Sequence, residues 1–208
     1  MKFLIADDHA LVRKGLKQIL REEFPSAEVT EVTGGSEVLK EVGNKKYDVI
    51  MLDISMSGRN GIEILKQIRA NGIKTPILII SMYPEELYAV RALKAGASGF
   101  VNKESANEEL LTAVHKVLSG RKYISSAIAE KLAETIGESS EKQAYQFLSD
   151  REMEVLQLIG SGKTGSEIAK ELSLSVNTIS THRYRILKKL SLNNNAELIR
   201  YSLDNDLV

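Results

Sequence analysis

The sequence predicts an α/β domain with a doubly wound, five-stranded parallel sheet, followed by a second, smaller all-α domain. Short apolar runs alternate with amphipathic stretches over residues 1 to about 121, and the third to fifth runs contain hardly any polar residues. Strands covered by helices on both faces have this composition, and repeated βα units build parallel sheets. After Phe147 the apolar spacing is helical throughout, which predicts the all-α domain.

Five strands and five helices are expected in the first domain. The strands begin near Lys2, Glu28, Asp48, Pro76 and Gly99. The helices cover Ala10–Glu23, Ser36–Val42, Gly61–Asn71, Glu85–Ala95 and Asn107–Ser119. The apolar spacing of the first helix predicts an inward face made of Leu11, Gly15, Ile19 and Leu20.

Residues 122–146 are expected to form a helix and a flexible linker between the domains. The spacing of an amphipathic helix is carried by Ile124, Ile128, Leu132 and Ile136. Residues 137–143 are polar and have no apolar face, which is typical of a linker. The first domain is therefore expected over residues 1–121 and the second over 147–208.

Local signals place the helices of the second domain. Ser149 with Glu152, and Thr164 with Glu167, each match the capping box that begins a helix. Ser175 is the expected N-cap of a third helix, and a fourth runs from about Asn195 to Asn205. An apolar stripe on this last helix is expected to pack on the core of the domain, and it consists of Ala196, Ile199, Leu203 and Leu207.

Composition narrows the possible functions. Lys plus Arg and Asp plus Glu both number 28, so total charge favours no partner, and any nucleic-acid site has to be a local patch. The chain has no Cys, which excludes disulfides and thiolate metal sites. It shows neither a signal peptide nor the run of about 18 apolar residues that spans a membrane. We therefore expect a cytoplasmic protein without a membrane partner.

Four of the expected strands end on residues that handle phosphoryl groups. Asp7 and Asp8 follow the first strand, Asp53 the third, Ser81 the fourth and Lys103 the fifth. The carboxyl ends of parallel strands meet at one edge, where open α/β sheets bind ligands. Clustered carboxylates require protons or a cation, and oxygen ligands alone favour Mg²⁺. A carboxylate there can attack phosphorus while the cations neutralise the phosphoryl oxygens. Each residue by itself also has an ordinary structural explanation, so the prediction rests on their joint arrangement.

The first 121 residues closely resemble the receiver domain of two-component response regulators, which is flavodoxin-like. The matching pieces are Asp7-Asp8, the stretch Asp53-Ile-Ser-Met-Ser-Gly-Arg-Asn-Gly61, Ser81, Ala95-Gly96-Ala97 and Phe100-Val-Asn-Lys103. The resemblance implies that Asp53 accepts a phosphoryl group from a phosphohistidine on a sensor histidine kinase. It also implies a Mg²⁺ site formed by Asp8, Asp53 and the carbonyl of Ser55, with Asp7 acting partly through water.

In the same resemblance, Ser81 and Lys103 bind the phosphate oxygens. Phe100 turns inward when Ser81 moves toward the phosphoryl group; the alternative for Phe100 is an ordinary core residue. The sequence departs from the family pattern at Ser57 and Glu104, where Pro is usual. Ser55 and Tyr83 stand where the family tunes the access of water, and we hypothesise that Tyr83 shields the acyl phosphate.

A basic segment lies in the second domain. There is no acidic residue from Ser173 to Leu190, whereas Arg183, Arg185, Lys188 and Lys189 are positive. On a helix beginning near Val176, the inward residues are expected to be Val176, Ile179, Ile186 and Leu190, and the outward ones Ser180, Thr181, Tyr184 and Lys188. An apolar back and a basic front suit the DNA major groove, although a solvated face on a helical bundle is the alternative.

This domain closely resembles the LuxR-type helix-turn-helix, and with the receiver it matches the NarL/FixJ subfamily. The matching pieces are Leu148-Ser-Asp-Arg-Glu-Met-Glu-Val-Leu156, Gly162-Lys-Thr-Gly-Ser-Glu-Ile-Ala169, Leu172-Ser-Leu-Ser-Val-Asn-Thr-Ile179 and His182. The resemblance makes Ser175 to about Leu190 the recognition helix. It places Ser180, Thr181 and Tyr184 near bases.

The same resemblance places Thr178, His182, Arg185 and Lys188 near phosphates, with helix packing as the alternative role for His182. The family usually has Lys at Ser180 and Asn-Lys at Gly165-Ser166, so we expect weaker non-specific binding and a smaller salt slope than in a typical relative. It also implies that the last helix meets its copy in a DNA-bound dimer.

The combined interpretation is a response regulator that accepts a phosphoryl group on Asp53 and binds double-stranded promoter DNA to regulate transcription. It would use Mg²⁺, form a homodimer when phosphorylated, and act as no enzyme beyond self-phosphotransfer and slow autodephosphorylation. One alternative is a DNA-binding regulator that needs no phosphorylation. Another is a Mg²⁺-dependent phosphohydrolase, which Ser55 disfavours because such enzymes usually have a second Asp two residues after the nucleophile.

Overall fold

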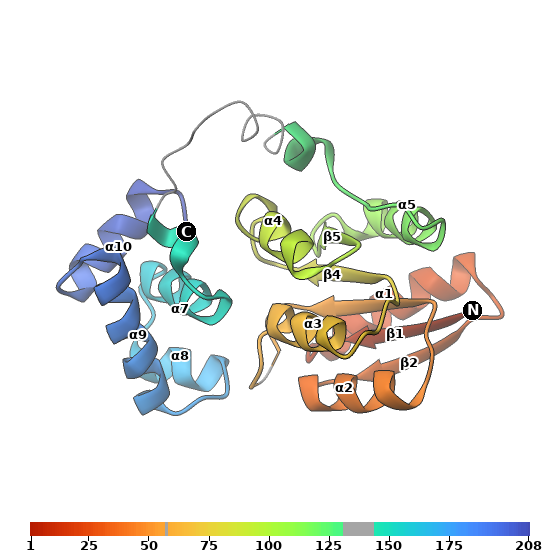
Figure 1. Cartoon of the computed structure of the whole chain (residues 1–208), viewed down its shortest axis with the longest axis horizontal. Coiled ribbons are helices and arrows are strands. Elements are labelled where there is room, and N and C mark those ends of the chain that lie inside the picture. The colour runs from red at the N-terminus through yellow and green to blue at the C-terminus, as the bar shows by residue number, and fades with distance from the viewer. Residues whose placement is uncertain (57, 131–143) are drawn as a thin grey trace. The chain divides into compact units, whose positions relative to one another are not determined.

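The computed structural model of the protein describes residues 1–56, 58–130 and 144–208 (Figure 1). The chain divides into two compact units, Met1–Ser139 and Ser140–Val208. Residues 126–130 are helical, but Ile124, with which the expected helix was to begin, is not. The rest of the helix expected to Ile136, and the expected polar linker over residues 137–143, lie outside the described residues. Among the described helices, none has both the length and the apolar character needed to cross a membrane.

Within the described part of the first unit, five strands form one parallel sheet in the order β2-β1-β3-β4-β5. The strands are β1 (Lys2–Ala6), β2 (Glu28–Val32), β3 (Val49–Asp53), β4 (Ile77–Ser81) and β5 (Gly99–Asn102). Every residue of β3 and β4 is buried, which confirms the prediction of strands covered on both faces. The strand order reverses between β1 and β3, the position where such sheets open a crevice for ligands.

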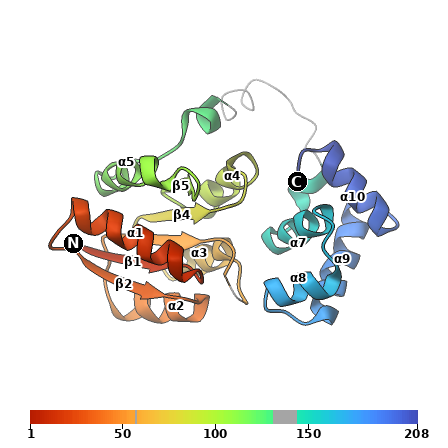
Figure 2. The same cartoon turned by 180° about the vertical axis from the view of Figure 1, so that it is seen from behind.

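Helices cover both faces of the sheet (Figures 1 and 2). One face carries α1 (Ala10–Glu23) and α5 (Ala106–Leu118). The other face carries α2 (Gly35–Asn44), α3 (Gly61–Ala70) and α4 (Glu85–Ala95). Alternate strand residues, including Phe3, Ile5, Met51, Leu78 and Ile80, share a core with α1 and α5. This packing fixes the height of each strand and so brings the strand ends to one edge.

The predicted inward face of α1 is partly wrong. Leu11 is 83% exposed and Gly15 is exposed, whereas Leu16 and Leu20 are buried. Val12 and Ile19 pack against the same core. Two apolar stripes overlap in this helix. The stripe that begins at Val12 packs against the sheet, and the one that begins at Leu11 does not.

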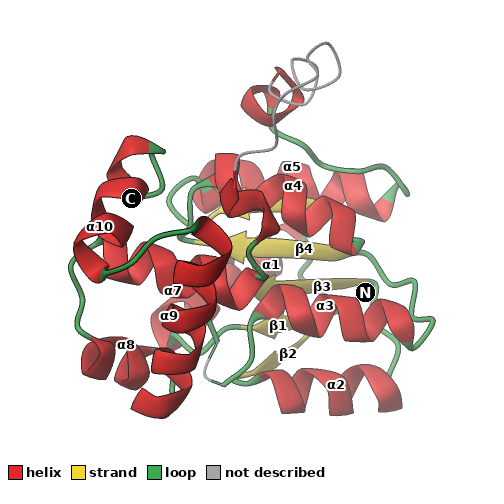
Figure 3. Ribbon diagram, turned by 60° about the vertical axis from the view of Figure 1, so that its left-hand side comes forward, coloured by secondary structure: helices red, strands yellow, loops and turns green. Residues whose placement is uncertain are grey.

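The second unit is helical in its described residues (Figure 3). A 3₁₀ turn over Ala144–Phe147 precedes α7 (Asp150–Gly160), α8 (Gly165–Glu171), α9 (Val176–Leu190) and α10 (Asn195–Asp204). Both predicted capping boxes are present, and Ser175 caps α9 by accepting the N–H of Thr178. These hydrogen bonds satisfy N–H groups that a helix start leaves unpaired.

The predicted apolar stripe of the last helix is wrong for Ala196 and Leu203, whereas Leu207 is buried and Ile199 is half-buried. The buried residues of this region are Leu198, Ser202 and Leu207, whereas Leu203 is 59% exposed and Ala196 is exposed. The cause is a close crossing of α7 and α10, where a Cβ added to Gly160 would lie 2.7 Å from the Cβ of Ser202. Because small residues meet at this crossing, α10 turns Ser202 inward and Leu203 outward.

Candidate functional sites

The ends of β1, β3 and β5 bring two carboxylates and an ammonium into direct contact. The Lys103 Nζ atom lies 2.7 Å from Asp7 Oδ2 and 2.8 Å from Asp53 Oδ2. Asp7, Asp53 and the β4 residue Ser81 are each only 1% exposed. The predicted cluster of strand-end residues is therefore a buried, charged site at the carboxyl edge of the sheet.

The positive charge of Lys103 does not fully offset the effects that disfavour the ionised form of Asp53. Burial and the neighbouring charge of Asp7 raise the pKa of Asp53 to about 7, although Lys103 opposes both effects. Burial works against the charge of Lys103 as well, but the two carboxylates outweigh it and raise the pKa of Lys103. The Asp53 Oδ1 atom is buried and has no hydrogen-bond partner among the described residues.

The acidic residues form a cluster that could hold a metal ion. One ligand atom from each of Asp7, Asp8, His9 and Asp53 lies within 4.8 Å of the others. Hard divalent cations prefer carboxylate oxygens, and the unpaired Oδ1 atom of Asp53 needs a cation or a donor. The donor set therefore fits the divalent ion that the receiver resemblance implies.

His9 and Arg13 are site residues that the sequence interpretation missed. The His9 Nδ1 atom lies 2.9 Å from Asp8 Oδ1, and the His9 backbone N–H donates to Asp7 Oδ1 at 2.7 Å. Arg13 reaches back from the first turn of α1 and donates to the Asp7 carbonyl at 2.7 Å. For His9 the signal was available, because it follows the two aspartates directly in the sequence.

The loop after β3 is held tightly at the end that carries Asp53. A Cβ added to Gly61 would lie 2.0 Å from the Asp53 carbonyl oxygen, so only glycine permits α3 to begin there. The Gly61 N–H donates to the Ile54 carbonyl at 2.8 Å, and the Asn60 side chain caps Ile62 at 2.9 Å. Ser55, whose carbonyl is the expected metal ligand, lies in this loop and forms a β-bridge with Asn60.

The β4 and β5 side of the site carries the expected switch residues. The Ser81 Oγ atom accepts the Tyr83 backbone N–H at 3.1 Å, and Phe100 is 2% exposed beside Ile79. The Tyr83 ring stacks on Tyr88 of α4, with ring centroids 4.8 Å apart. A buried Phe100 fits both an inward switch position and an ordinary core residue, so its switching role stays a prediction.

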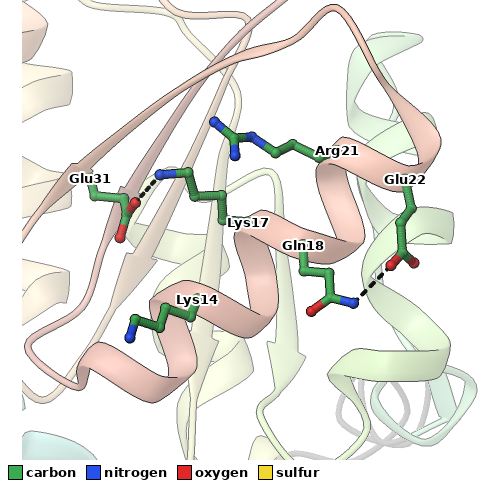
Figure 4. Close-up of a pocket in the computed structure, with 6 residues that line it drawn as sticks. All are labelled: Lys14, Lys17, Gln18, Arg21, Glu22 and Glu31. Carbon is green, nitrogen blue, oxygen red and sulfur yellow. Dashed lines mark hydrogen bonds and ion pairs between the residues drawn. The ribbon is translucent and has the colours of Figure 1, made fainter.

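A hollow on the outer side of α1 is distinct from the carboxylate cluster (Figure 4). It is lined by Lys14, Lys17, Gln18, Arg21, Glu22 and Glu31. Lys17 forms an ion pair with Glu31 of β2, and Glu31 also lies 3.5 Å from the Arg13 Nε atom. Because Arg13 donates to the Asp7 carbonyl, the contacts of Glu31 help to hold Asp7 in position.

In the second unit, α9 presents a polar and basic face to solvent. Ile179, Ile186, Leu187 and Leu190 are buried, whereas Val176 is 48% exposed, which corrects its expected inward position. The expected contacts Ser180, Thr181, Tyr184, Arg185 and Lys188 are exposed. Two other basic residues are used within the unit, because Arg183 binds Asn195 and Lys189 binds Glu152. Arg185 and Lys188 have no ion-pair partner among the described residues.

Thr178 and His182 are less accessible than the other expected DNA contacts. The Thr178 hydroxyl lies 2.8 Å from that of Ser175, so it takes part in the helix cap. His182 is half-buried, and burial together with Arg151 and Arg185 lowers the pKa of its ring. A neutral, half-buried ring favours the helix-packing alternative for His182.

Comparisons with known proteins agree with both halves of this description. Residues 3–115 match the response regulator receiver domain, and residues 146–202 match the bacterial regulatory proteins of the luxR family. The chain is 35% identical to the oxygen regulatory protein NreC of Staphylococcus epidermidis, over 100% of this chain and 99% of that protein.

Two solved structures extend the comparison. RcsB from Salmonella enterica serovar Typhimurium, bound to promoter rprA with the phosphomimetic BeF3-, is 29% identical with a TM-score of 0.61, covering 97% of this chain and 98% of that one. A LuxR-family two-component response regulator from Aurantimonas sp. is 33% identical with a TM-score of 0.60, covering 66% of this chain and 98% of that one. The chain thus belongs to the response regulators of two-component systems that join a receiver domain to a LuxR-type DNA-binding domain and regulate transcription.

Proposed function

We propose that Asp53 is the residue that accepts the phosphoryl group, from a phosphohistidine of a sensor histidine kinase. The observation that carries this proposal is the placement of Asp53 Oδ2 on the Lys103 ammonium while its Oδ1 atom has no partner among the described residues. An Asp53 oxygen would attack phosphorus, the P–N bond would break, and its electron pair would return to the imidazole ring. Lys103 and Ser81 would then bind the phosphoryl oxygens.

Mg²⁺ would be held by Asp7, Asp8, Asp53 and the Ser55 carbonyl, and would supply positive charge to the transferred group. Without that charge, Asp7 and a phosphorylated Asp53 would repel each other in a buried site. Lys103 already neutralises part of this repulsion, because it contacts both carboxylates. The protein therefore needs the ion most when Asp53 carries the phosphoryl group.

Phosphorylation would change DNA binding through Ser81 and Phe100. A phosphoryl group on Asp53 draws the Ser81 hydroxyl toward it, and the space that Ser81 leaves allows Phe100 to settle inward. The surface near α4, β5 and α5 then differs between the two states, which promotes dimerisation, frees the helical domain, or both. A switch requires a free-energy difference between states, and the new contacts of the phosphoryl group supply it.

For the output, we propose that α9 enters the major groove of promoter DNA. Arg185 and Lys188 would contact phosphates, because they are exposed cations that no ion pair within the described residues neutralises. Ser180, Thr181 and Tyr184 would face the bases. Thr178 and His182 would lie near the DNA phosphates. The Ser175 cap would hold Thr178 in place, and helix packing would hold His182.

The central experiment compares wild type with Asp53→Asn in Mg²⁺ and acetyl phosphate. Intact mass spectrometry should show a phosphoryl adduct on wild type and none on Asp53→Asn, and only wild type should then bind promoter DNA more tightly. Asp48→Asn, an exposed carboxyl that directly precedes β3 at the opposite edge of the sheet, is the matched control and should behave as wild type. Equal labelling of wild type and Asp53→Asn would refute the assignment of Asp53.

The same experiment separates the two alternatives. A regulator that needs no phosphorylation would bind DNA equally well before and after treatment with acetyl phosphate. A phosphohydrolase would release phosphate from small esters over many turnovers, although Ser55 lacks the carboxyl group that would protonate the leaving group.

The DNA-binding proposal has its own test in Arg185→Ala combined with Lys188→Ala. Loss of two phosphate contacts should weaken binding at moderate salt by at least tenfold. Lys40→Ala is the matched control, because Lys40 is an exposed cation on α2, in the other unit. Unchanged affinity in the double variant would remove α9 from its proposed role.

A further inference from the structure

The first turn of α9 carries an exposed side-chain amide, that of Asn177. Asn177 is the second residue of α9, directly after Val176, and it is exposed. Its side-chain amide has no hydrogen-bond partner among the described residues, since only its backbone carbonyl is used. The N-terminal residues of a recognition helix are the ones that reach base edges.

Helical spacing places Asn177 at the centre of the exposed face rather than at its border. Asn177, Thr181, Tyr184 and Lys188 follow one another at intervals of four, three and four residues, which forms a single row along a helix. All four are exposed, and the opposite row contains the buried Ile179 and Ile186. Asn177 therefore begins the same row that ends on the proposed phosphate contact Lys188.

The neighbouring hydroxyl groups are already engaged, which leaves Asn177 with a distinct chemical role. The Ser175 Oγ atom accepts the Thr178 N–H at 3.0 Å and lies 2.8 Å from the Thr178 hydroxyl. The Thr181 hydroxyl donates to the Asn177 carbonyl at 2.9 Å. Among these four residues, Asn177 alone keeps a side-chain donor and acceptor that are both unused.

A side-chain amide is complementary to one base edge in the major groove. Adenine offers the N7 acceptor and the N6 donor, which an asparagine amide matches with two hydrogen bonds. Guanine offers two acceptors there and is read by Arg or Lys, but the first basic residue of α9 is Arg183, which binds Asn195. The half-exposed Val176 adds an apolar surface next to Asn177, suited to a thymine methyl group.

We propose that Asn177 is a specificity-determining residue that reads an adenine through two hydrogen bonds, so that the half-site contains an A·T pair at this position. This inference rests on the proposed entry of α9 into the major groove. Phosphate contacts give no direct preference for sequence, and the Asn177 contact would supply a preference for one base.

The test begins with selection of sites from a random duplex pool, in parallel for wild type and Asn177→Ala, both treated with acetyl phosphate and Mg²⁺. The wild-type site should contain an A·T position that becomes degenerate for Asn177→Ala while the remaining positions persist. Asn177→Asp keeps the shape of the side chain but loses the donor, and it should lose the same adenine preference. Asn44→Ala, an exposed asparagine at the end of α2, is the matched control and should select the wild-type site.

A base analogue then tests the hydrogen bonds directly. Replacing that adenine by 7-deazaadenine removes only the N7 acceptor. Wild-type affinity should fall about tenfold, and Asn177→Ala should bind both duplexes equally. The inference is overturned if Asn177→Ala retains the adenine preference, or if wild type binds the two duplexes equally. Failure of the proposed function is distinguishable, because wild type would then enrich no site and the Arg185/Lys188 double variant would bind as wild type does.

Discussion

Asp53 is held by an ion pair and is nevertheless hard to ionise. Lys103 lies 2.8 Å from one oxygen, yet burial and Asp7 raise the pKa of Asp53 from 3.8 to about 7. Because its folded-state pKa is raised, Asp53 stabilises the fold most below pH 3.8, and this contribution disappears as the pH rises through about 7. A shift of this size corresponds to about 4 kcal/mol when the carboxyl is fully ionised.

We therefore predict that Asp53→Asn stabilises the metal-free protein above pH 7 and has little effect at pH 4. The reason is that the amide carries no charge at either pH, whereas the carboxyl must ionise in a buried site. Thermal unfolding in the presence of a chelator at the two pH values measures this difference. Added Mg²⁺ should raise the melting temperature of wild type at pH 8 more than that of Asp53→Asn; an equal rise in both would place the ion elsewhere.

Tyr83 gives a second prediction at the residue scale. Its ring is fixed by stacking on Tyr88, and its backbone N–H binds Ser81, so it stands close to the proposed phosphoryl group. Tyr83→Ala should shorten the lifetime of the acyl phosphate several-fold, because water gains access to it. The decay of the phosphorylated mass after removal of acetyl phosphate measures that lifetime. Tyr83→Phe keeps the ring and should decay as wild type does; an unchanged lifetime in Tyr83→Ala contradicts the shielding hypothesis.

At the scale of elements, the crossing of α7 and α10 depends on a glycine. We predict that Gly160→Ala destabilises the helical unit by about 1–3 kcal/mol, because the new methyl group would meet Ser202 at 2.7 Å. Gly165→Ala is the matched control, since a Cβ there would meet nothing within 4 Å. It should leave stability unchanged or raise it by up to about 1 kcal/mol. Urea unfolding followed by circular dichroism distinguishes the two variants.

The sequence was sufficient for features that depend on neighbouring residues and insufficient for those that depend on packing. Both capping boxes and the burial of β3 and β4 follow from local pattern, and they were predicted. The inward faces of α1 and α10 were not, because each helix has more apolar residues than its unit buries. Which stripe is buried depends on contacts such as Gly160 with Ser202, which no periodicity records.

The candidate site shows the same division. Asp7, Asp53, Ser81 and Lys103 were predicted together because strand ends of a parallel sheet share one edge. Arg13 was missed because its role depends on a backbone carbonyl, that of Asp7, which carries no sequence signal. Asn177 was missed because exposure and an unused amide become visible only when the neighbouring hydrogen bonds are known.

At the scale of the whole molecule, the outward residues of α10 become relevant to assembly. Leu203 is 59% exposed and shares a face with Ala196 and the half-buried Ile199. We predict that Leu203→Asp leaves the fold intact but prevents the phosphorylated protein from binding DNA as a dimer, because a charge would enter the contact between copies. Gel-shift stoichiometry on a two-half-site duplex tests this. Lys40→Ala, an exposed position on α2, serves as the control. A dimeric complex of Leu203→Asp would contradict the expected contact between the two α10 helices.

The salt dependence of DNA affinity measures how many phosphate contacts the whole protein forms. Each phosphate contact contributes about 0.9 to the slope of log affinity against log salt. The double substitution Arg185→Ala and Lys188→Ala should therefore reduce the slope by about 1.8. Fluorescence anisotropy over a range of salt concentrations measures it. A lower affinity with an unchanged slope would mean that these residues act through helix packing rather than through phosphates.

The close approach of Gly61 to the Asp53 carbonyl makes the surroundings of Asp53 unequal in stiffness. On the β3 side, a glycine contact, a β-bridge and the Asn60 cap restrain the backbone, so that side cannot retreat when a bulky anion arrives. On the β4 side, the Ser81 hydroxyl accepts one hydrogen bond, from the Tyr83 N–H, and the next residue, Met82, is 59% exposed. Displacement should therefore travel in one direction, from the rigid loop toward α4. If both sides of Asp53 were equally stiff, the strain would stay at the site and no displacement would reach α4.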